Sequence, residues 1–164
     1  MDPSIRWDDV SEDRRHSNVD YPWPSLPPGD TAVKQLINID VPDLVAAETF
    51  YSRAFGLRSG RRLGGEVLEM LGGTAPLYLL QKAPGCVGAG NDTRHYQRHW
   101  MPMHLDVVVD ELEPALQRAL AAGAVREGLI REAEWGRIVQ IADPFGHGWC
   151  LLQFLGRGYD EIAT

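Results

Sequence analysis

The feature that most constrains the fold of this chain is an internal repeat in the order of its predicted elements. A strand pattern, a helix pattern and three further strand patterns run from about residue 33 to residue 82, and the same order returns from about 103 to 155. Alternating β-branched and other apolar residues indicate the strands, and apolar stripes at spacings of three and four residues indicate the helices. A repeated unit of this size cannot bury its own sheet face, so we expect the two copies to pair around a shared cleft.

Two anchors fix the register of the repeat independently of each other. Aligning "VPDL" in the first copy with "VDEL" in the second makes His104 the counterpart of Leu36. Aligning "LYLLQK" with "WCLLQF" makes Cys150 the counterpart of Tyr78. The two strands that contain "LLQ" are therefore expected to form walls of the same cleft.

The same register relates two further pairs of polar residues. Asn38 and Asp106 lie at equivalent positions of the two first strands. Glu69 and Gln140 fall at similarly related positions of the two third strands, where the lengths of the turns make the register less strict. The repeat therefore predicts polar side chains at equivalent strand positions in the two copies.

Each copy also contains one amphipathic helix. The first helix is predicted in "PDLVAAETFYSRAF", where Asp43 is placed to cap its start and Gly56 to end it. The second is predicted in "DELEPALQRALAAG", with Leu112, Leu116 and Leu120 on its apolar face. Both helices should cover the apolar face of a sheet.

The segments outside the repeat differ from it in amino-acid composition. The N-terminal segment is charged and then rich in proline ("YPWPSLPPGD"), which indicates a flexible arm, and the segment between the copies is rich in glycine and polar residues, which indicates a linker. The predicted boundaries are an arm at 1–30, a single domain at 31–156 with module one at 33–82, a linker at 83–102 and module two at 103–155, and a C-terminal tail at 157–164.

Charge and composition argue against several classes of partner. Sixteen basic residues against 23 acidic ones give a net charge of -7, which disfavours nucleic acid and anionic membranes. We see no apolar signal-peptide region at the start and no apolar run near the roughly 20 residues that a membrane span needs. The two cysteines, Cys86 and Cys150, are expected to be free thiols. We therefore expect a cytoplasmic protein.

The doubled element order, the segment "VPDLVAAETFYSRAFGL" and the hairpin "ADPFGHGWCLLQF" resemble the vicinal oxygen chelate superfamily. That superfamily contains glyoxalase I, bleomycin-resistance proteins, fosfomycin-resistance enzymes, methylmalonyl-CoA epimerases and extradiol dioxygenases. The resemblance covers residues 33 to about 155 and implies an α+β fold, in which two βαβββ modules form a cupped, eight-stranded mixed sheet with a ligand inside. It is specific for the fold and not for a reaction, because this fold carries many chemistries.

Metal-dependent members of the superfamily draw ligands from the first and last strands of each module. By the resemblance, these positions are Leu36, Tyr78, His104 and Cys150. Leu36 has no donor atom, a phenol is a poor ligand near neutral pH, and two remaining side chains are too few for a catalytic divalent ion. We therefore expect no cofactor and no standard metal site, with His104 as a weak candidate ligand and a weakly held divalent metal as the alternative.

Alternation along the strands predicts which side chains line the cup. In "MHLDVVV", the residues Leu105, Val107 and Val109 form an apolar face, which leaves His104 and Asp106 for the cup. The predicted ligand-binding residues are Leu36, Asn38, Tyr78, His104, Asp106, Gln140, Cys150, Leu152 and Phe154. A few polar groups in an apolar setting suit a small organic ligand.

Three of the polar residues are candidate catalytic groups, namely His104, Glu69 and Asp106. His104 is a semi-buried imidazole bonded to Asp106 or Asn38, a ligand contact or general base, or a metal ligand. Glu69 is either a proton-abstracting base in an apolar cup or a solvated carboxylate at the cup mouth. Cys150 is expected to be a small, core-like side chain.

Four further side chains lie in loops, and the sequence leaves their roles open. His147 lies between two glycines in a turn, where exposure to solvent is the default expectation. His95, Tyr96, His99 and Trp100 in the linker either form a lid over the cup or pack against a partner subunit.

Three functions from different classes are compatible with these observations. The first is a metal-free protein that binds a drug or metabolite, as bleomycin-resistance relatives do. The second is an enzyme of the lyase, isomerase or dioxygenase type that uses His104 with Glu69 or Asp106. The third is a subunit whose cup serves mainly dimer assembly. We expect the first, with a small organic molecule as ligand and a homodimer as the assembly.

Overall fold

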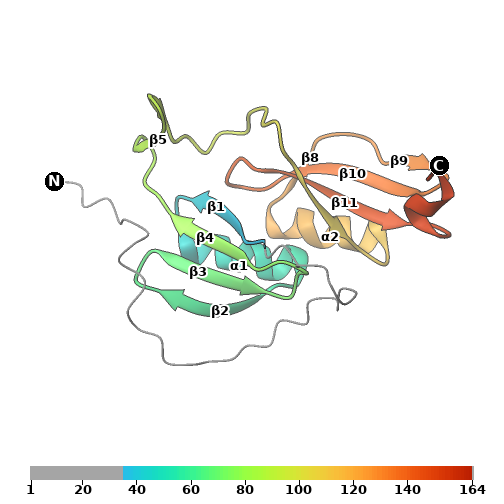
Figure 1. The fold of residues 1–164 in the computed structure, drawn as a ribbon, viewed down its shortest axis with the longest axis horizontal. Helices are drawn as coiled ribbons and strands as arrows, with labels where there is room; N and C mark the ends of the chain where they lie inside the picture. The colour runs from blue at the N-terminus through green and yellow to red at the C-terminus, as the bar shows by residue number, and fades with distance from the viewer. Residues whose placement is uncertain (1–34, 164) are drawn as a thin grey trace, which may run out of the picture. The chain divides into compact units, whose positions relative to one another are not determined.

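The computed structural model describes residues 35–163, and the predicted arm at 1–30 lies outside the described residues. All described elements belong to one unit, Lys34–Thr164. Module one consists of β1 (Ile37–Val41), α1 (Leu44–Phe55), β2 (Arg58–Leu63), β3 (Val67–Leu71) and β4 (Leu77–Gln81) (Figure 1). Module two consists of β7 (Leu105–Val108), α2 (Leu112–Ala122), β8 (Val125–Arg126), β9 (Arg131–Ala133), β10 (Gly136–Ala142) and β11 (Gly148–Phe154), followed by a short 3-10 helix (Gly158–Glu161). The predicted α+β fold with a repeated element order is confirmed.

The two modules have the same sheet topology. The strand orders are β1-β4-β3-β2 and β7-β11-β10-β8, with β9 added beside β10. In both modules the first strand runs parallel to the last one, and the remaining pairs are antiparallel. The described strands form separate sheets of four and five strands rather than one continuous eight-stranded sheet, because β1 and β7 are edge strands that pair only within their own modules.

The predicted register of the repeat also agrees with the strand pairing. We call two sets of neighbouring residues the module-one rung and the module-two rung. The module-one rung is Asn38, Tyr78 and Glu69, on β1, β4 and β3. The module-two rung is Asp106, Cys150 and Gln140, on β7, β11 and β10. Each residue of one rung therefore occupies the same topological place as its counterpart in the other.

Local signals determine where the helices begin and end. The carboxylate of Asp43 accepts hydrogen bonds from the backbone N–H groups of Val45 at 2.8 Å and Ala46 at 3.0 Å, which caps α1 as predicted. Gly56 ends this helix with a φ of 72°, a left-handed conformation that favours glycine. None of the described helices is long and apolar enough to cross a membrane.

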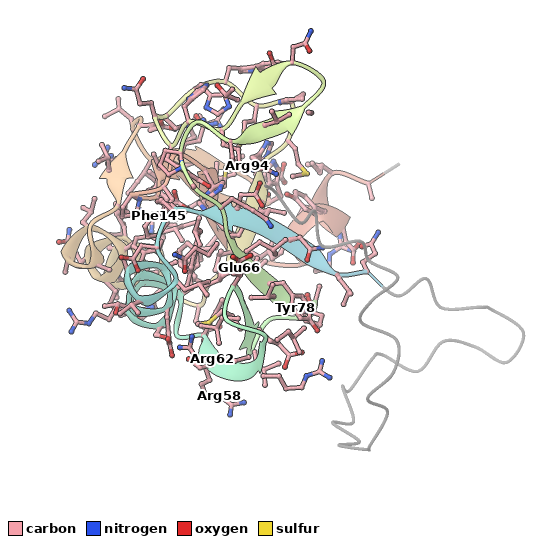
Figure 2. All side chains as sticks on the ribbon, turned by 90° about the vertical axis from the view of Figure 1, so that its left-hand side faces the viewer. Arg58, Arg62, Glu66, Tyr78, Arg94 and Phe145 are labelled. Atoms are coloured by element: carbon pink, nitrogen blue, oxygen red, sulfur yellow. The ribbon has the colours of Figure 1, made fainter. Side chains whose placement is uncertain are left out.

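One hydrophobic core joins the two modules, and α1 and α2 pack against each other within it (Figure 1). The apolar strand faces contribute to this core as alternation predicted, with Ile39 and Val41 buried and Leu105 and Val107 packed against it. The rung residues alternate with core residues along their strands, so they project from the opposite side of each sheet. Figure 2 shows Tyr78 on the side of the module-one sheet that faces away from α1.

The linker is more ordered than its composition suggested. It forms a two-stranded hairpin from β5 (Val87–Ala89) and β6 (Asp92–Thr93). The Arg94 side chain fixes this hairpin to module one, because its Nε donates to Asp40 Oδ2 at 2.6 Å. The Tyr96 hydroxyl donates to the carbonyl of Lys82 at 2.7 Å. These contacts hold the linker against module one.

Candidate functional site

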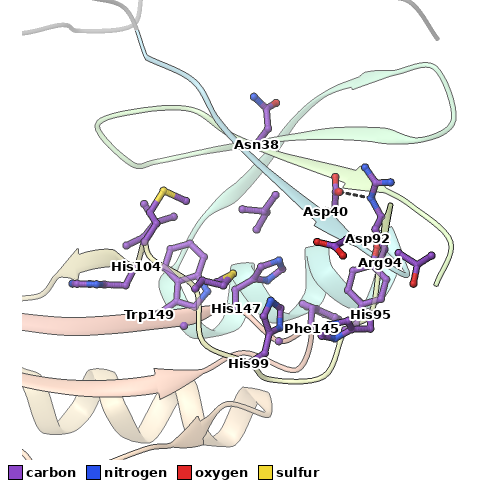
Figure 3. Close-up of a pocket in the computed structure, with 18 residues that line it drawn as sticks. Asn38, Asp40, Asp92, Arg94, His95, His99, His104, Phe145, His147 and Trp149 are labelled. Atoms are coloured by element: carbon purple, nitrogen blue, oxygen red, sulfur yellow. Dashed lines mark hydrogen bonds and ion pairs between the residues drawn. The ribbon is translucent and has the colours of Figure 1, made fainter. Parts of the chain in front are cut away.

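The main cavity of the described residues lies between the edge strands β1 and β7 and has a volume of about 740 Å³ (Figure 3). We call it the seam pocket. It is lined by residues 38–40 of β1, residues 92–96, 99 and 101 of the linker, residues 103–105 at the start of β7, and residues 145–149 at the turn between β10 and β11. The pocket therefore occupies the place where a continuous sheet would have joined the two modules.

The walls of the seam pocket combine apolar and aromatic groups with histidines. Ile39, Leu105, Phe145 and Trp149 supply apolar surface. Four imidazoles also line the pocket, those of His95, His99, His104 and His147 (Figure 3). Asp40, Asp92 and Arg94 add charged groups, so the seam pocket is a mixed polar and apolar site.

The linker passes closely over the turn between β10 and β11. Gly146 has a φ of 91°, and a Cβ atom at this position would lie 3.0 Å from the carbonyl oxygens of Tyr96 and Gln97. His95, Tyr96 and His99 line the pocket, whereas Trp100 is 81% exposed. Three of the four linker residues singled out in the sequence therefore lie at the pocket.

In the module-one rung, Arg61 forms hydrogen bonds with Glu69 and Tyr78, a contact that the sequence did not predict. Arg61 Nη2 donates to Glu69 Oε1 at 2.6 Å, and Arg61 Nε donates to Glu69 Oε2 at 3.0 Å. The Tyr78 hydroxyl donates to Glu69 Oε1 at 2.7 Å. The hydrogen bond to Glu69 raises the pKa of Arg61 above its usual value, although partial burial opposes this.

These contacts correct the expectation that Glu69 is a solvated carboxylate at the mouth of a cup. The side chain is buried, with an exposed fraction of 0%. Glu69 therefore neutralises Arg61 inside module one.

The module-two rung has a different character. His104 Nε2 lies 3.5 Å from Asp106 Oδ1, and the His104 side chain is 62% exposed. Donor atoms of His104, Asp106 and Cys150 all lie within 4.8 Å of one another. Burial, together with the nearby Asp106, raises the pKa of Cys150 to about 11, so its thiol is protonated near neutral pH. Cys150 is buried as expected.

Most of the other predicted ligand-binding residues lie outside the seam pocket. Asn38 and His104 line it. Gln140 is exposed beside Cys150, and Leu152 is buried. Leu36 is 57% exposed, and Phe154 packs against Tyr159 with a ring-centroid distance of 4.9 Å. The structure therefore divides the predicted set between the pocket and the two rungs.

Comparison with known proteins identifies the family. The sequence profile of the glyoxalase-like domain matches residues 36–152, which is most of the described chain. The chain belongs to the glyoxalase-like domain family. The profile spans both modules, so both rungs and the seam pocket lie within the matched region.

Solved structures of glyoxalase-like proteins share this fold at low sequence identity. A glyoxalase family protein from Bacillus cereus has a TM-score of 0.61 at 17% identity, over 80% of this chain and 100% of that one. The fosfomycin resistance protein FosX from Mesorhizobium loti has a TM-score of 0.60 at 16% identity, over 82% and 100%. Lactoylglutathione lyase from Agrobacterium tumefaciens has a TM-score of 0.54 at 22% identity, over 76% and 95%.

Curated relatives match over a shorter stretch. An uncharacterized protein of Mycobacterium bovis is 40% identical over 53 residues, which are 32% of this chain and 35% of that protein. An uncharacterized protein of Mycobacterium tuberculosis matches with the same identity over 31% of its length. The match therefore spans about a third of the length of these relatives.

The positions at which metal-dependent superfamily members place their ligands do not form a matching set in this glyoxalase-like domain. Leu36 has no donor atom, and the Tyr78 hydroxyl is engaged by Glu69 and Arg61. Cys150 carries a protonated thiol, whereas metal binding requires the thiolate. Of the four positions, His104 and Cys150 carry possible ligand atoms, and these lie together with a carboxylate oxygen of Asp106 within 4.8 Å of one another.

One further group, His147, lies at the seam pocket, although its position in the sequence did not indicate this. His147 was expected to be exposed, but its side chain is only 17% exposed and its Nδ1 lies 2.7 Å from Asp143 Oδ2. Asp143 also accepts hydrogen bonds from the backbone N–H groups of Phe145 and His147. An Asp that begins a Pro/Gly turn commonly accepts such bonds, so "DPFGH" was the signal that could have revealed this arrangement.

Proposed function

We propose that this glyoxalase-like domain binds a small organic molecule in the seam pocket without the standard divalent metal of the superfamily. The observation that supports this most directly is a cavity of about 740 Å³ that combines apolar and aromatic side chains with polar and charged ones. A volume of this size suits a drug-sized or metabolite-sized ligand. His104, just before β7, and His147, at the turn between β10 and β11, would contact the ligand.

The chemistry of the rungs supports binding without a metal. In module one the polar groups satisfy one another through Arg61, Glu69 and Tyr78. In module two the Cys150 thiol is protonated. Hydrogen bonds and apolar contacts, rather than coordination, are then the means by which this pocket would hold a ligand.

We further propose that the protein is a homodimer. The edge strands β1 and β7 have no pairing partner beyond their own sheets among the described residues, and unpaired strand edges favour association. Leu36 and Val108 are 57% and 60% exposed, which places large apolar side chains at these edges. Light scattering coupled to size-exclusion chromatography tests this proposal, and a monomeric mass at high protein concentration would contradict it.

Calorimetric titration with a panel of planar aromatic molecules tests the binding function. We expect saturable binding by at least one compound, weakened about threefold to tenfold by His104→Ala, as expected for the loss of one hydrogen bond. The exposed substitution Gln117→Ala on α2 serves as the control and should leave the affinity unchanged. Absence of binding across a chemically broad panel would contradict the proposal.

Metal analysis tests the second half of the proposal. Purified protein, incubated separately with Ni²⁺, Zn²⁺, Mn²⁺ and Fe²⁺ and then desalted, should retain no stoichiometric ion. A stoichiometric ion that is lost in His104→Ala would show instead that His104, Asp106 and Cys150 form a metal site.

A second candidate function is proton transfer on a carbonyl substrate, in the manner of a lyase or isomerase. The supporting observation is the pairing of His104 and Asp106 at 3.5 Å beside the seam pocket, since a carboxylate can orient an imidazole that acts as a base. Hydrogen–deuterium exchange at carbon atoms next to a carbonyl, followed by NMR on small ketones, tests this function. Exchange that persists unchanged in both His104→Ala and Asp106→Asn would exclude this pair.

A further inference from the structure

We propose that Nε2 of His147 is the hydrogen-bond acceptor of the seam pocket, and that the pocket takes neutral aromatic compounds carrying an acidic hydroxyl group. This inference rests on the proposed binding function, because it names the class of ligand for the same pocket. Asp143 is the positioning residue in this arrangement and does not touch the ligand.

The first step in the argument is the environment of Asp143. The Asp143 side chain is buried, and its Oδ2 accepts hydrogen bonds from the Tyr51 hydroxyl at 2.5 Å and from Trp149 Nε1 at 3.1 Å. Its Oδ1 accepts from the backbone N–H groups of Phe145 at 2.8 Å and His147 at 2.9 Å. Groups from α1, from the turn and from β11 therefore hold the carboxylate in place.

The second step is the protonation pattern that this environment imposes. Burial by itself would raise the pKa of Asp143, but the hydrogen bonds that its carboxylate accepts from His147 and Tyr51 outweigh it and hold the pKa below its usual value. An ionised carboxylate only accepts hydrogen bonds, so Nδ1 of His147, at 2.7 Å, is the donor. A neutral imidazole that donates through Nδ1 presents a lone pair at Nε2.

The third step is the position of Nε2. His147 lines the seam pocket, and Figure 3 shows its ring among the pocket side chains. Among the described residues, every fully buried side-chain nitrogen or oxygen atom has a hydrogen-bond partner. The hydrogen bonds of the His147 side chain lead to Asp143 through Nδ1. Nε2 is therefore the ring atom left to meet a ligand or water in the pocket.

The four imidazoles of the pocket differ in how firmly they are held. His104 is 62% exposed and pairs with Asp106, itself partly exposed, at 3.5 Å. His99 is exposed and interacts through Nδ1 with the carbonyl of Gln97 at 2.9 Å. His147 is mostly buried against a fixed carboxylate. A preorganised acceptor in a mostly dry position contributes more to binding than a mobile one in water.

The remaining charges of the pocket indicate which ligands it would accept. Asp40 and Asp92 line the pocket, and the guanidinium of Arg94 is engaged by Asp40 at 2.6 Å. Two carboxylates against one guanidinium leave an excess of negative charge, which disfavours phosphate and carboxylate ligands. Phe145 and Trp149 also line the pocket, each with 6% of its surface exposed, and give its wall a partly aromatic character. A neutral ring with a strongly donating O–H group satisfies both conditions.

Comparing para-chlorophenol with para-chloroanisole by titration calorimetry at about pH 8, where both the phenol and an ordinary imidazole are neutral, tests this inference. The two probes have similar shapes, and only the phenol can donate a hydrogen bond. We expect the protein to bind the phenol about threefold to tenfold more tightly, in line with one hydrogen bond. His147→Asn should remove this preference, because asparagine can keep the contact with Asp143 but lacks an atom at the position of Nε2.

A matched control and a second measurement make the outcomes distinct. Gln117→Asn, on the exposed face of α2, should retain the full preference for the phenol. Heteronuclear NMR of the imidazole nitrogens in the unaltered protein should show His147 protonated at Nδ1, with Nε2 shifting on addition of the phenol. An equal affinity for both probes, or a preference that survives in His147→Asn, would overturn the inference and leave the binding function standing. Failure of both probes to bind would overturn the inference and count against the binding function as well.

Discussion

Module one and module two have the same strand order and the same register, but they use their polar residues differently. In the module-one rung, Glu69 is buried and bound by Arg61 and Tyr78. In the module-two rung, Asp106 is exposed and neighbours a protonated thiol. A duplicated backbone therefore carries a closed, internally neutralised polar cluster in one copy and an open one in the other.

The turns between the last two strands differ in the same way. In module one this turn contains Gly72 and Gly73 and only closes a hairpin. In module two it contains Asp143, which ties α1 to β11 and fixes His147 at the seam pocket. The difference shows how one copy of a repeat can maintain the fold while the other copy supplies a site. Four experiments test whether the two modules differ in this way.

The largest effect is expected from Asp143→Ala. The substitution leaves the Tyr51 hydroxyl, the Trp149 indole N–H and two backbone N–H groups without their acceptor. Buried donors without a partner are costly, so we expect the free energy of unfolding to fall by about 3–5 kcal/mol. Urea denaturation measures the change, with the exposed substitution Asp160→Ala as the control. A loss below about 1 kcal/mol would show that the turn does not depend on this carboxylate.

A smaller effect is expected from Glu69→Gln. This change removes the negative charge that faces Arg61, but the Arg61 side chain is 48% exposed, so water can partly replace the lost contact. We expect the free energy of unfolding to fall by about 1–3 kcal/mol. Glu48→Gln, which disrupts the more exposed pair with Arg62, should cost less than about 1 kcal/mol. Equal losses for the two substitutions would contradict a special role for the buried pair.

The two turns can be compared directly with Gly146→Ala and Gly72→Ala. Both glycines have a positive φ, of 91° and 119°, which is strained for alanine. At Gly72 the nearest side-chain atom to an added Cβ lies 3.6 Å away, in Leu57, whereas at Gly146 the linker carbonyls lie at 3.0 Å. We expect Gly146→Ala to destabilise the protein by about 1 kcal/mol more than Gly72→Ala. Thermal unfolding of both variants provides the measurement, and a larger loss for Gly72→Ala would contradict the proposed closeness of linker and turn.

The smallest effect on stability, but a clear one on reactivity, is expected at the cysteines. Burial raises the pKa of Cys150 to about 11, and its side chain is inaccessible, whereas Cys86 is half-buried. A thiol-specific reagent at neutral pH should therefore modify Cys86 in the native protein and reach Cys150 only on unfolding. Cys86→Ser should abolish native labelling, and Cys150→Ser should leave it unchanged. Rapid labelling of Cys86→Ser would show that the module-two rung is open to reagents.

Local patterns in the sequence were sufficient to predict much of the fold. Alternation predicted the buried faces of β1 and β7, and Asp43 and Gly56 marked the ends of α1 as the structure has them. The two sequence anchors also predicted the register of the rungs. Side chains alternate between the two faces of a strand, so one aligned pair of residues determines which other residues are equivalent. These are properties of neighbours in the chain, which is why the chain itself reveals them.

The polar partners of the site could not be obtained in the same way. The contact between Arg61 and Glu69 depends on an irregularity in the pairing of β2 with β3 between Ser59 and Arg62. The hydrogen bond from Tyr51 to Asp143 joins residues 92 positions apart. No alternation or helical period specifies such contacts, so the sequence did not reveal the hydrogen-bond partners of Glu69 and His147, nor the burial of the His147 side chain.

Local patterns in the chain specify the two βαβββ modules, their apolar faces and the matching of their strands. The pairing of β1 and β7 only within their own sheets, and the polar groups that meet at the seam pocket, follow from tertiary contacts. The physical reason is that a repeating pattern specifies which face of an element is buried, whereas the partner of a buried charge depends on whatever distant segment packs against it.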